Sequence, residues 1–289
     1  MIVFRFRPIE TPLFSGRHLS SLLNMRPGRY VVDASLGYGT LRIVVSILED
    51  SIMLGAAEIS IDQIKESAKH ARRIYTIVGD ELVPLSIYEK ERLYQLVMFE
   101  SCRTPTLEIS GIHMHRVVVD PLFDDARSKV RILRPRRGSS VLEICTGLGY
   151  STYWLLRRGT NIVASIEKNE SVLRLAEYNP WSRHLSRVPI ILGDASEVVK
   201  KYDDMSFDYI FHDPPRYSVA PELYSYEFYK ELLRILRPGG VLFHYVGEPR
   251  KKRGTNIIGG VLRRLREAGF SRVIRRANVQ CILATKPRS

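Results

Sequence analysis

The chain has 289 residues, of which 45% are hydrophobic and 26% charged, a balance typical of a soluble globular protein. Its length allows one large domain or two, and no apolar run reaches the roughly 18–20 residues that would cross a bilayer. The first seven residues alternate in polarity, which predicts a short strand and excludes a signal peptide. Cys102, Cys145 and Cys281 lie far apart, so the sequence indicates neither a metal site nor a disulfide framework, and we expect a reducing, cytoplasmic setting.

The positive charge is concentrated in the second half of the chain. Residues 1–128 carry 15 Lys and Arg against 16 Asp and Glu, whereas residues 129–289 carry 29 against 15, a net charge of +14. Much of the excess lies in four short clusters, at residues 134–137, 250–253, 263–266 and 272–276. Such clusters favour a polyanionic partner such as nucleic acid. The alternative is a solvated basic surface, as in a heat-adapted protein.

We expect residues 1–110 to form a smaller N-terminal accessory domain of the α+β class. Residues 111–289 are expected to form a second domain. Apolar spacing predicts a helix over residues 61–75. Strands are predicted at residues 30–32, 41–48, 51–54, 82–85 and 93–99, the last of which could also be helical.

The accessory domain contains a sequence that imitates a nucleotide-binding turn. Asp33 follows an apolar run, and Gly37 and Gly39 come after it. The next residues, 41–45, are rich in β-branched side chains, which favour a strand over a helix. We therefore predict a hairpin turn here and no cofactor.

Two histidines, His113 and His115, lie in the segment that joins the halves. Their spacing could place both on one strand face, but no further ligand completes a metal set, so buried or substrate-contacting histidines are the preferred interpretation. Residues 124–133 then predict a helix.

From residue 139 onward, strands and helices alternate. The predicted strands are residues 140–144, 161–166, 188–192, 207–211, 240–246, 271–274 and 279–284, and the predicted helices are residues 151–158, 170–178, 195–201, 224–236 and 256–268. This alternation predicts a doubly wound parallel sheet of the α/β class. The last two strands are close enough to form a hairpin, which would make one antiparallel edge strand.

Acidic residues mark the ends of the first four predicted strands of this sheet. Glu143 precedes Gly147 and Gly149, Glu167 follows about 20 residues after the turn, and Asp194 and Asp213 come after the third and fourth strands. Ligands of such sheets bind at the carboxyl ends of the strands. A dinucleotide fold would have a third small residue where Thr152 stands, so the pattern disfavours a dinucleotide.

Over about residues 110–287 the chain resembles the class I S-adenosylmethionine-dependent methyltransferases. The resemblance rests on residues 143–149, Glu167, Asp194, residues 213–216 and the turn at residues 236–240. It implies a Rossmann-like, seven-stranded sheet and S-adenosyl-L-methionine as cofactor. The cofactor-binding residues that it implies are Glu143, Thr146, Gly147, Gly149, Tyr150, Ser151, Glu167, Lys168, Asp194 and Ala195.

The element Asp213-Pro214-Pro215 resembles the motif of family members that methylate exocyclic amines. A carboxylate and a backbone carbonyl that accept the N–H bonds would free the lone pair of an aryl amine, and the prolines would stiffen the loop. Arg216 stands where an aromatic residue is expected, and Tyr217 follows one place later. These five residues are therefore the predicted catalytic set, with Tyr217 stacking on a base and Arg216 binding phosphate or a base edge.

The whole arrangement also resembles an archaeal group of predicted RNA methyltransferases with an Asp-Pro-Pro-Arg motif, which implies methylation of cytidine N4 in ribosomal RNA. A cysteine-based attack on the cytosine ring is disfavoured, because Cys145 belongs to the first turn and Cys281 to the last strand. The expected partner is RNA, with no membrane and no metal. The alternatives are a spermidine-synthase-like aminopropyltransferase, a tRNA N2-guanine methyltransferase, and a non-enzymatic RNA-binding factor.

Overall fold

The computed structural model describes residues 1–247 and 257–288, so the basic cluster expected at residues 250–253 lies outside the described residues. The chain forms two compact units: unit 1 consists of Met1–Phe6, Asp125–Glu170 and His184–Ser289, and unit 2 of Arg7–Asp124 and Ser171–Arg183. The units therefore alternate along the chain. The division expected at residue 110 falls inside unit 2, and the first six residues belong to unit 1.

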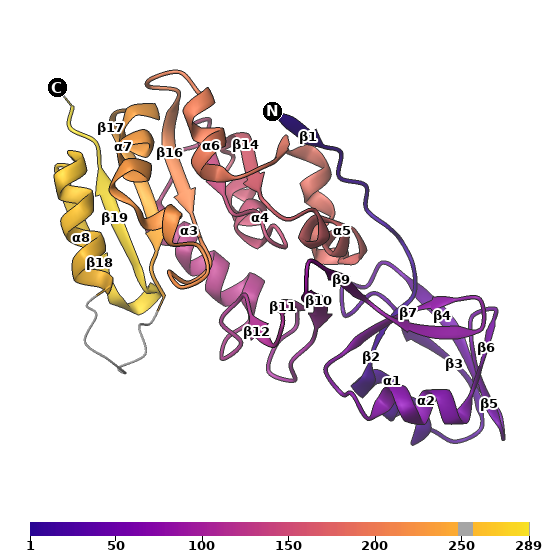
Figure 1. Ribbon diagram of the computed structural model, residues 1–289. Helices are drawn as coiled ribbons and strands as arrows, with labels where there is room; N and C mark the ends of the chain where they lie inside the picture. Colours follow the sequence, from indigo (N-terminus) through magenta and orange to yellow (C-terminus); the bar gives the residue numbers. More distant parts are fainter. Residues whose placement is uncertain (248–256, 289) are drawn as a thin grey trace. The chain divides into compact units, whose positions relative to one another are not determined.

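Within the described residues, unit 1 is built on an eight-stranded sheet of order β1-β15-β14-β13-β16-β17-β19-β18 (Figure 1). The strands are β1 (Ile2–Phe4), β13 (Ser140–Ile144), β14 (Asn161–Glu167), β15 (Ile190–Leu192), β16 (Phe207–His212), β17 (Leu236–Tyr245), β18 (Arg272–Arg276) and β19 (Cys281–Thr285). The strands β13 to β17 are parallel to one another. The chain leaves β13 toward β14 on one side and later returns to β16 on the other, which makes the β13–β16 boundary a switch point where ligands of such sheets bind.

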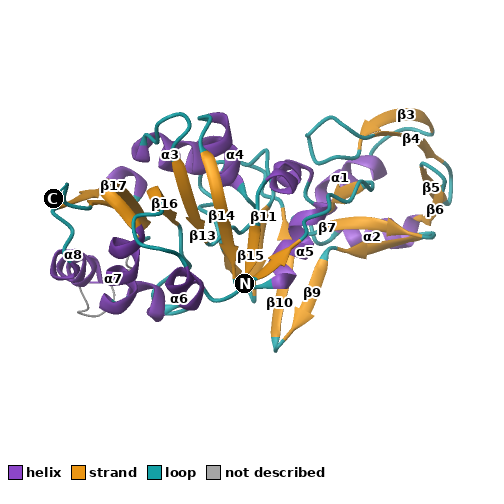
Figure 2. Cartoon of the chain, turned by 90° about the horizontal axis from the view of Figure 1, so that it is seen from above, coloured by secondary structure: helices purple, strands orange, loops and turns teal. Residues whose placement is uncertain are grey.

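Helices cover both faces of this sheet. They are α3 (Arg127–Leu133), α4 (Tyr150–Arg157), α6 (Ala195–Val198), α7 (Tyr226–Ile235) and α8 (Ile257–Ala268), while α5 (Glu170–Tyr178) begins in unit 1 and continues into unit 2. Figure 2 shows α3 and α4 on one face of the sheet and α6, α7 and α8 on the other. This arrangement confirms the Rossmann-like α/β class.

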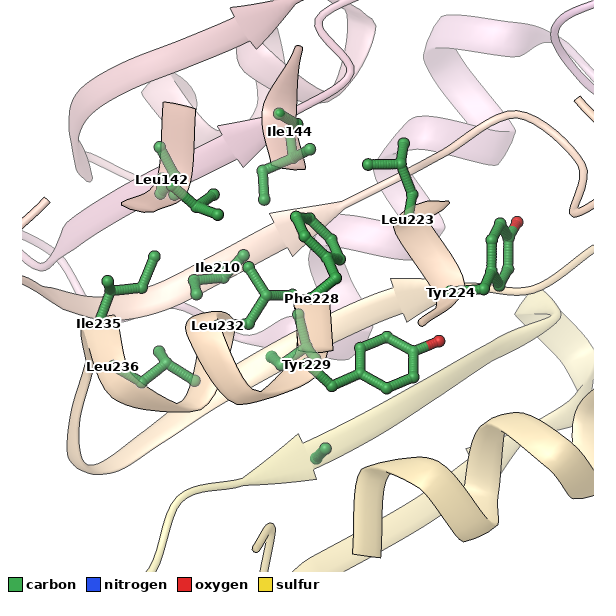
Figure 3. Packing of buried hydrophobic residues seen from close by; sticks show 14 of the residues in the cluster. Leu142, Ile144, Ile210, Leu223, Tyr224, Phe228, Tyr229, Leu232, Ile235 and Leu236 are labelled. Atoms are coloured by element: carbon green, nitrogen blue, oxygen red, sulfur yellow. The ribbon is translucent and has the colours of Figure 1, made fainter. Parts of the chain in front are cut away.

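The core under α7 shows why this sequence forms that helix. Phe228, Leu232 and Ile235 recur at helical spacing and are buried, and the Ser225 side chain caps the helix by accepting a hydrogen bond from the backbone of Phe228 (3.1 Å). Figure 3 shows these apolar side chains directed at the sheet residues of the same cluster, among them Leu142. Burial of this stripe holds the helix on the sheet.

Two features of the sheet differ from the expectation of seven strands with an antiparallel edge. The last strand, β19, is antiparallel as expected, but it lies between β17 and β18 and is therefore not the edge strand. At the other edge β1 pairs antiparallel with β15 and adds an eighth strand. An edge strand has unpaired backbone groups on its outer side, and β1 satisfies those of β15.

Unit 2 consists largely of small antiparallel sheets, of orders β3-β4-β5-β6, β2-β7-β8 and β12-β11-β10-β9. The strands are β2 (Leu13–Ser15), β3 (Gly28–Asp33), β4 (Arg42–Ile47), β5 (Ser51–Leu54), β6 (Ala57–Ser60), β7 (Ile74–Val78), β8 (Glu81–Pro84), β9 (Ser86–Glu89), β10 (Arg92–Val97), β11 (Thr106–Ile109) and β12 (Ile112–His113), and the helices are α1 (Gly16–Leu23) and α2 (Ile61–Ala68). The helix expected over residues 61–75 is thus wrong in its second half, because β7 pairs with β2 and β8.

The turn that imitates a nucleotide-binding motif is a hairpin, as predicted. Strands β3 and β4 pair antiparallel, and the Asp33 carboxylate accepts a hydrogen bond from the backbone of Gly37 (2.7 Å). The histidines of the same unit are engaged locally: His113 pairs with Glu108 (2.7 Å), and His115 contacts Thr106 (2.7 Å).

Candidate active site

The acidic strand ends meet at one edge of the unit 1 sheet. Strands β15, β14, β13 and β16 are neighbours in that order, and Asp194, Glu167 and Asp213 follow or end three of them, while Glu143 lies one residue before the end of β13. Because the four strands are parallel, their carboxyl ends share an edge. The predicted residues are therefore brought together at the switch point.

The turn after β13 leaves open space at Gly147. Cys145, Gly147 and Gly149 all adopt left-handed backbone conformations, with φ of 70°, 55° and 73°. A Cβ on Gly147 would meet nothing within 4 Å, whereas one on Gly149 would lie 2.6 Å from Cδ2 of Leu185. Gly149 is thus required by packing. Gly147 borders open space, where its small size permits close approach of another molecule.

Glu143 supports the turn from below. Its carboxylate is completely buried and accepts three side-chain hydrogen bonds of 2.6 Å, from the hydroxyls of Ser151, Thr152 and Ser165. Burial raises the pKa of Glu143, and the three hydroxyl donors act against that rise. Both oxygens of Glu143 and the Ser151 hydroxyl are engaged within the protein. These bonds orient the start of α4, and a direct contact of Glu143 or Ser151 with the cofactor stays a prediction.

Glu167 links the second strand to the glycine turn. One carboxylate oxygen accepts a hydrogen bond from the backbone of Gly147 (3.0 Å), and the other accepts from the backbones of Lys168 (2.9 Å) and Asn169 (3.0 Å). Burial raises the pKa of Glu167 and these N–H donors oppose the rise. A carboxylate has about four acceptor positions, so Glu167 retains capacity for a hydroxyl donor beside the open space at Gly147.

The end of β15 carries a partly exposed acid. Asp194 caps α6 by accepting from the backbone of Ser196 (2.9 Å), and its other oxygen forms an ion pair with Lys168 (2.7 Å). Burial would raise the pKa of Asp194, but the hydrogen bonds from Lys168 and Ser196 leave it below its usual value. Ala195 is buried at the start of α6.

The remaining predicted cofactor residues are buried around the turn. Thr146 contacts the hydroxyl of Ser165 (2.7 Å), and Tyr150 is the buried first residue of α4.

Asp213 is partly exposed and belongs to a cluster of three charged groups, of which the other two, Lys129 and Asp125, are buried. Its Oδ2 lies 2.8 Å from Nζ of Lys129 on α3, and the same Nζ lies 2.8 Å from Oδ2 of Asp125. Lys129 is 5% exposed, and its ammonium lies 4.0 Å from the centroid of the Tyr245 ring. Burial raises the pKa of Asp213, attraction by Lys129 lowers it, and repulsion by Asp125 raises it, with a net rise. The Asp213 backbone is tied to β13 through a hydrogen bond to the Ile144 carbonyl (3.3 Å).

The loop after Asp213 combines one buried and several accessible residues. Pro214 is buried, and the carbonyl of Pro215 accepts a hydrogen bond from the Tyr224 hydroxyl (2.7 Å). This carbonyl is therefore engaged by a side chain, and its second lone pair can accept a further hydrogen bond. Arg216 is exposed, and Tyr217, 41% exposed, has its ring edge-on to Tyr224 at 5.5 Å between centroids.

A pair of buried histidines lies directly beneath this loop. His212 and His244, paired in register on β16 and β17, stack with ring centroids 4.5 Å apart. Nε2 of His244 contacts the Tyr229 hydroxyl (3.0 Å), while the other three ring nitrogens have no hydrogen-bond partner within the described residues. Burial lowers the pKa of His244 to about 3 and that of His212 well below its ordinary value, so both rings are neutral at pH 7.

The cysteine of the turn is not activated. Burial, reinforced by the surrounding carboxylates, raises the pKa of Cys145 well above its ordinary value, which keeps the thiol protonated. Across residues 1–247 and 257–288, no group of three or more His, Cys, Asp and Glu side chains could hold a metal ion. In the same part of the chain, no helix has the length and apolar character of a membrane-spanning segment.

Sequence reasoning missed Lys129, Asp125 and Tyr224. The spacing of Asp125 and Lys129, four residues apart on a predicted helix, could have suggested a pair. Nothing local connects Lys129 with Asp213, which is 84 residues away.

The open space at Gly147 and the acceptor capacity of Glu167 fit S-adenosyl-L-methionine, a cofactor with ribose hydroxyls that needs close backbone approach. A family model described as S-adenosyl-L-methionine-dependent methyltransferase matches residues 171–280. The fold and the site thus define a class I S-adenosyl-L-methionine-dependent methyltransferase.

The chain belongs to the same family as an uncharacterized protein of Methanocaldococcus jannaschii, with which it shares 44% identity over 234 residues, 80% of each chain. A Mycobacterium tuberculosis protein named as an O-methyltransferase is 33% identical over 109 residues, which cover 36% of this chain and 46% of that protein. The fold is also similar to that of spermidine synthase from Thermotoga maritima, with a TM-score of 0.56 at 14% identity, over 91% of this chain and 81% of the other.

Proposed function

We propose that this methyltransferase modifies an exocyclic base amine of RNA, with N4 of cytidine in ribosomal RNA as its target. The observation that carries the proposal is the carboxylate of Asp213, followed by two prolines, at the same strand edge as the glycine turn. The net charge of +14 on residues 129–289 supports a polyanionic substrate, because Lys and Arg neutralise the phosphates of a nucleic acid.

In this proposal the cofactor supplies a methyl group activated by a sulfonium. Gly147 admits it to the turn, Glu167 accepts from its ribose, and Asp194 lies on the adenine side. Lys168 and Ala195 lie next to Glu167 and Asp194 and belong to the same proposed cofactor site. The protein adds no nucleophile of its own, which agrees with the protonated thiol of Cys145.

Asp213 then acts on the acceptor. An aryl amine is a poor nucleophile because its lone pair is delocalised into the ring. A carboxylate that accepts one N–H bond favours a pyramidal nitrogen with the lone pair free, and the same oxygen can hold the proton that the nitrogen loses after transfer. Lys129 occupies Oδ2 of Asp213, so Oδ1 is the oxygen proposed for this contact. Tyr217 would stack on the base and Arg216 would bind phosphate.

An aminopropyltransferase is the second candidate, favoured by the fold similarity to spermidine synthase. Such an enzyme needs carboxylates that are available for a polyamine cation. Asp204 forms an ion pair with Arg234 (2.6 Å), and Asp208 forms one with Arg237 (3.2 Å). Asp213 is already paired with a buried lysine. These pairings favour the methyltransferase over the polyamine enzyme.

The experiment offers the protein labelled S-adenosyl-L-methionine with ribosomal RNA, with transfer RNA, and, separately, decarboxylated cofactor with polyamines. Nucleoside mass spectrometry then distinguishes N4-methylcytidine from N2-methylguanosine. We expect methylated cytidine from ribosomal RNA, and transfer of an aminopropyl group to a polyamine would refute the proposal.

The variant Asp213→Ala should lose methyl transfer by at least a hundredfold, in the range for a group that acts on the proton of the reacting atom, while retaining cofactor binding by calorimetry. The matched control is Asp204→Ala, an exposed acid in the loop that precedes β16, which should retain full activity. Full activity of Asp213→Ala would contradict the proposed role.

A further inference from the structure

The side chain of Lys129 carries an ammonium group that is almost completely buried. Its Nζ lies 2.8 Å from one oxygen of each of two carboxylates, Asp125 and Asp213, and the face of Tyr245 covers it. Burial alone would lower the pKa of Lys129, but attraction by the two carboxylates leaves it above the ordinary value, so the lysine is charged. A buried lysine is retained only when such partners offset its loss of hydration.

Lys129 and Asp125 have opposite effects on the ionisation of Asp213. The cation of Lys129 stabilises the ionised form of Asp213, and the carboxylate of Asp125 destabilises it. Lys129 also fixes one oxygen of Asp213 in a defined direction, since a buried ammonium with two partners has little freedom to turn.

We propose that Lys129 is a positioning residue for Asp213 and holds Oδ2 so that Oδ1 faces the reacting amine. The charges of Lys129 and Asp125 also act in opposite directions on the ionisation of Asp213. The electrostatic part of this inference depends only on the fold, and its consequence for amine methylation rests on the function proposed above. Lys129 itself touches no substrate.

Several other titratable groups face Asp213, but Lys129 and Asp125 are the pair that we expect to control its pKa. From the remaining elements these other groups are Glu143 on β13, Cys145 in the turn, Tyr224 and Cys281 on β19. Tyr245 on β17 lies over the ammonium of Lys129. Burial raises the pKa of Cys281 to about 12, and it raises the pKa values of Cys145 and Tyr224, so these three groups remain neutral near pH 7. Burial also raises the pKa of Glu143, whose hydroxyl partners keep it in place.

Two substitutions test the inference because they shift Asp213 in opposite directions. Lys129→Met removes the cation at similar side-chain length, and the pKa of Asp213 should rise by about one to three units. Asp125→Asn removes the repulsion, and the pKa of Asp213 should fall by about one unit. The control Lys200→Met removes an exposed lysine paired with Glu197 and should change nothing.

The first readout is the ¹³C NMR titration of aspartate carboxyls in the full-length protein, with the Asp213 signal assigned from Asp213→Asn. It needs no substrate. The second is the acid limb of the pH–rate profile for RNA methylation, which should move with the NMR value in each variant. Circular dichroism establishes that each variant is folded. If Lys129→Met does not fold, the downward shift in Asp125→Asn alone decides.

Opposite shifts in the two variants support the inference. An Asp213 titration that is unchanged in both, or that moves the same way in both, overturns it. If the wild-type protein methylates no RNA while the NMR shifts appear, the proposed function fails and the coupling of Lys129 to Asp213 stands. If methylation occurs and its acid limb stays fixed while the NMR value shifts, ionisation of Asp213 does not control the reaction and the catalytic part of the inference is overturned.

Discussion

Gly147 offers a direct test of where the cofactor lies, because a second glycine provides a matched control. Gly147 and Gly138 both have left-handed backbones, with φ of 55° and 74°, and a Cβ added to either would meet no atom within 4 Å. An alanine at either position should therefore destabilise the fold by a similar amount. The left-handed conformation costs a residue with a Cβ about 1–2 kcal/mol.

The two substitutions should differ in cofactor binding. Gly147 lies beside Glu167 at the carboxyl edge of the sheet, whereas Gly138 lies in the loop before β13, at the amino end of that strand. In Gly147→Ala the methyl group occupies the open space where the cofactor would approach. We expect at least a tenfold loss of affinity for S-adenosyl-L-methionine, about 1.4 kcal/mol, and no loss in Gly138→Ala.

Isothermal titration calorimetry measures the affinities, and urea denaturation measures the free energies of unfolding of the same preparations. Equal affinities in the two variants would refute the assignment of this space to the cofactor. A much larger loss of stability in Gly147→Ala than in Gly138→Ala would refute the reasoning from open space. Gly149→Ala is unsuitable for this test, because its methyl group would collide with Leu185.

Three further predictions concern buried groups. Burial lowers the pKa of His244 to about 3, so between this value and about 6.5 only the unfolded chain binds the proton, and the free energy of unfolding falls as the pH falls. Between pH 7 and pH 5 the free energy of unfolding of His244→Phe should therefore fall by about 2 kcal/mol less than that of the wild type, as measured by urea denaturation at each pH. Equal decreases in the two proteins would contradict the pKa shift. Glu143→Ala leaves three buried hydroxyls without their acceptor, and the free energy of unfolding measured in urea should fall by about 3 kcal/mol or more. Thermal unfolding should show a lower midpoint. A decrease below about 1 kcal/mol would mean that the hydroxyls find other partners. Because the Cys145 thiol is protonated, Cys145→Ala should transfer methyl groups to the proposed substrate at close to the wild-type rate. A loss of activity with normal cofactor affinity would argue for a thiol in the mechanism.

The sequence by itself determined the order of strands and helices in unit 1. The strand Ser140–Ile144 and the helix Glu170–Tyr178 were predicted at their observed bounds, because apolar periodicity is a local property that each segment carries in its own side chains. It also indicated that Glu167 and Asp213 lie at one edge, since the alternation of strands and helices requires parallel neighbours.

The tertiary structure alone decided which distant residues meet. The strand β1 completes the sheet by pairing with β15, nearly 190 residues later, and this contact depends on a free strand edge that no local pattern reveals. In the same way, Glu143 is enclosed by hydroxyls from two other elements, and Lys129 reaches Asp213 across 84 residues. Such contacts depend on how elements pack, and a buried charge finds its partner only after the chain has folded around both.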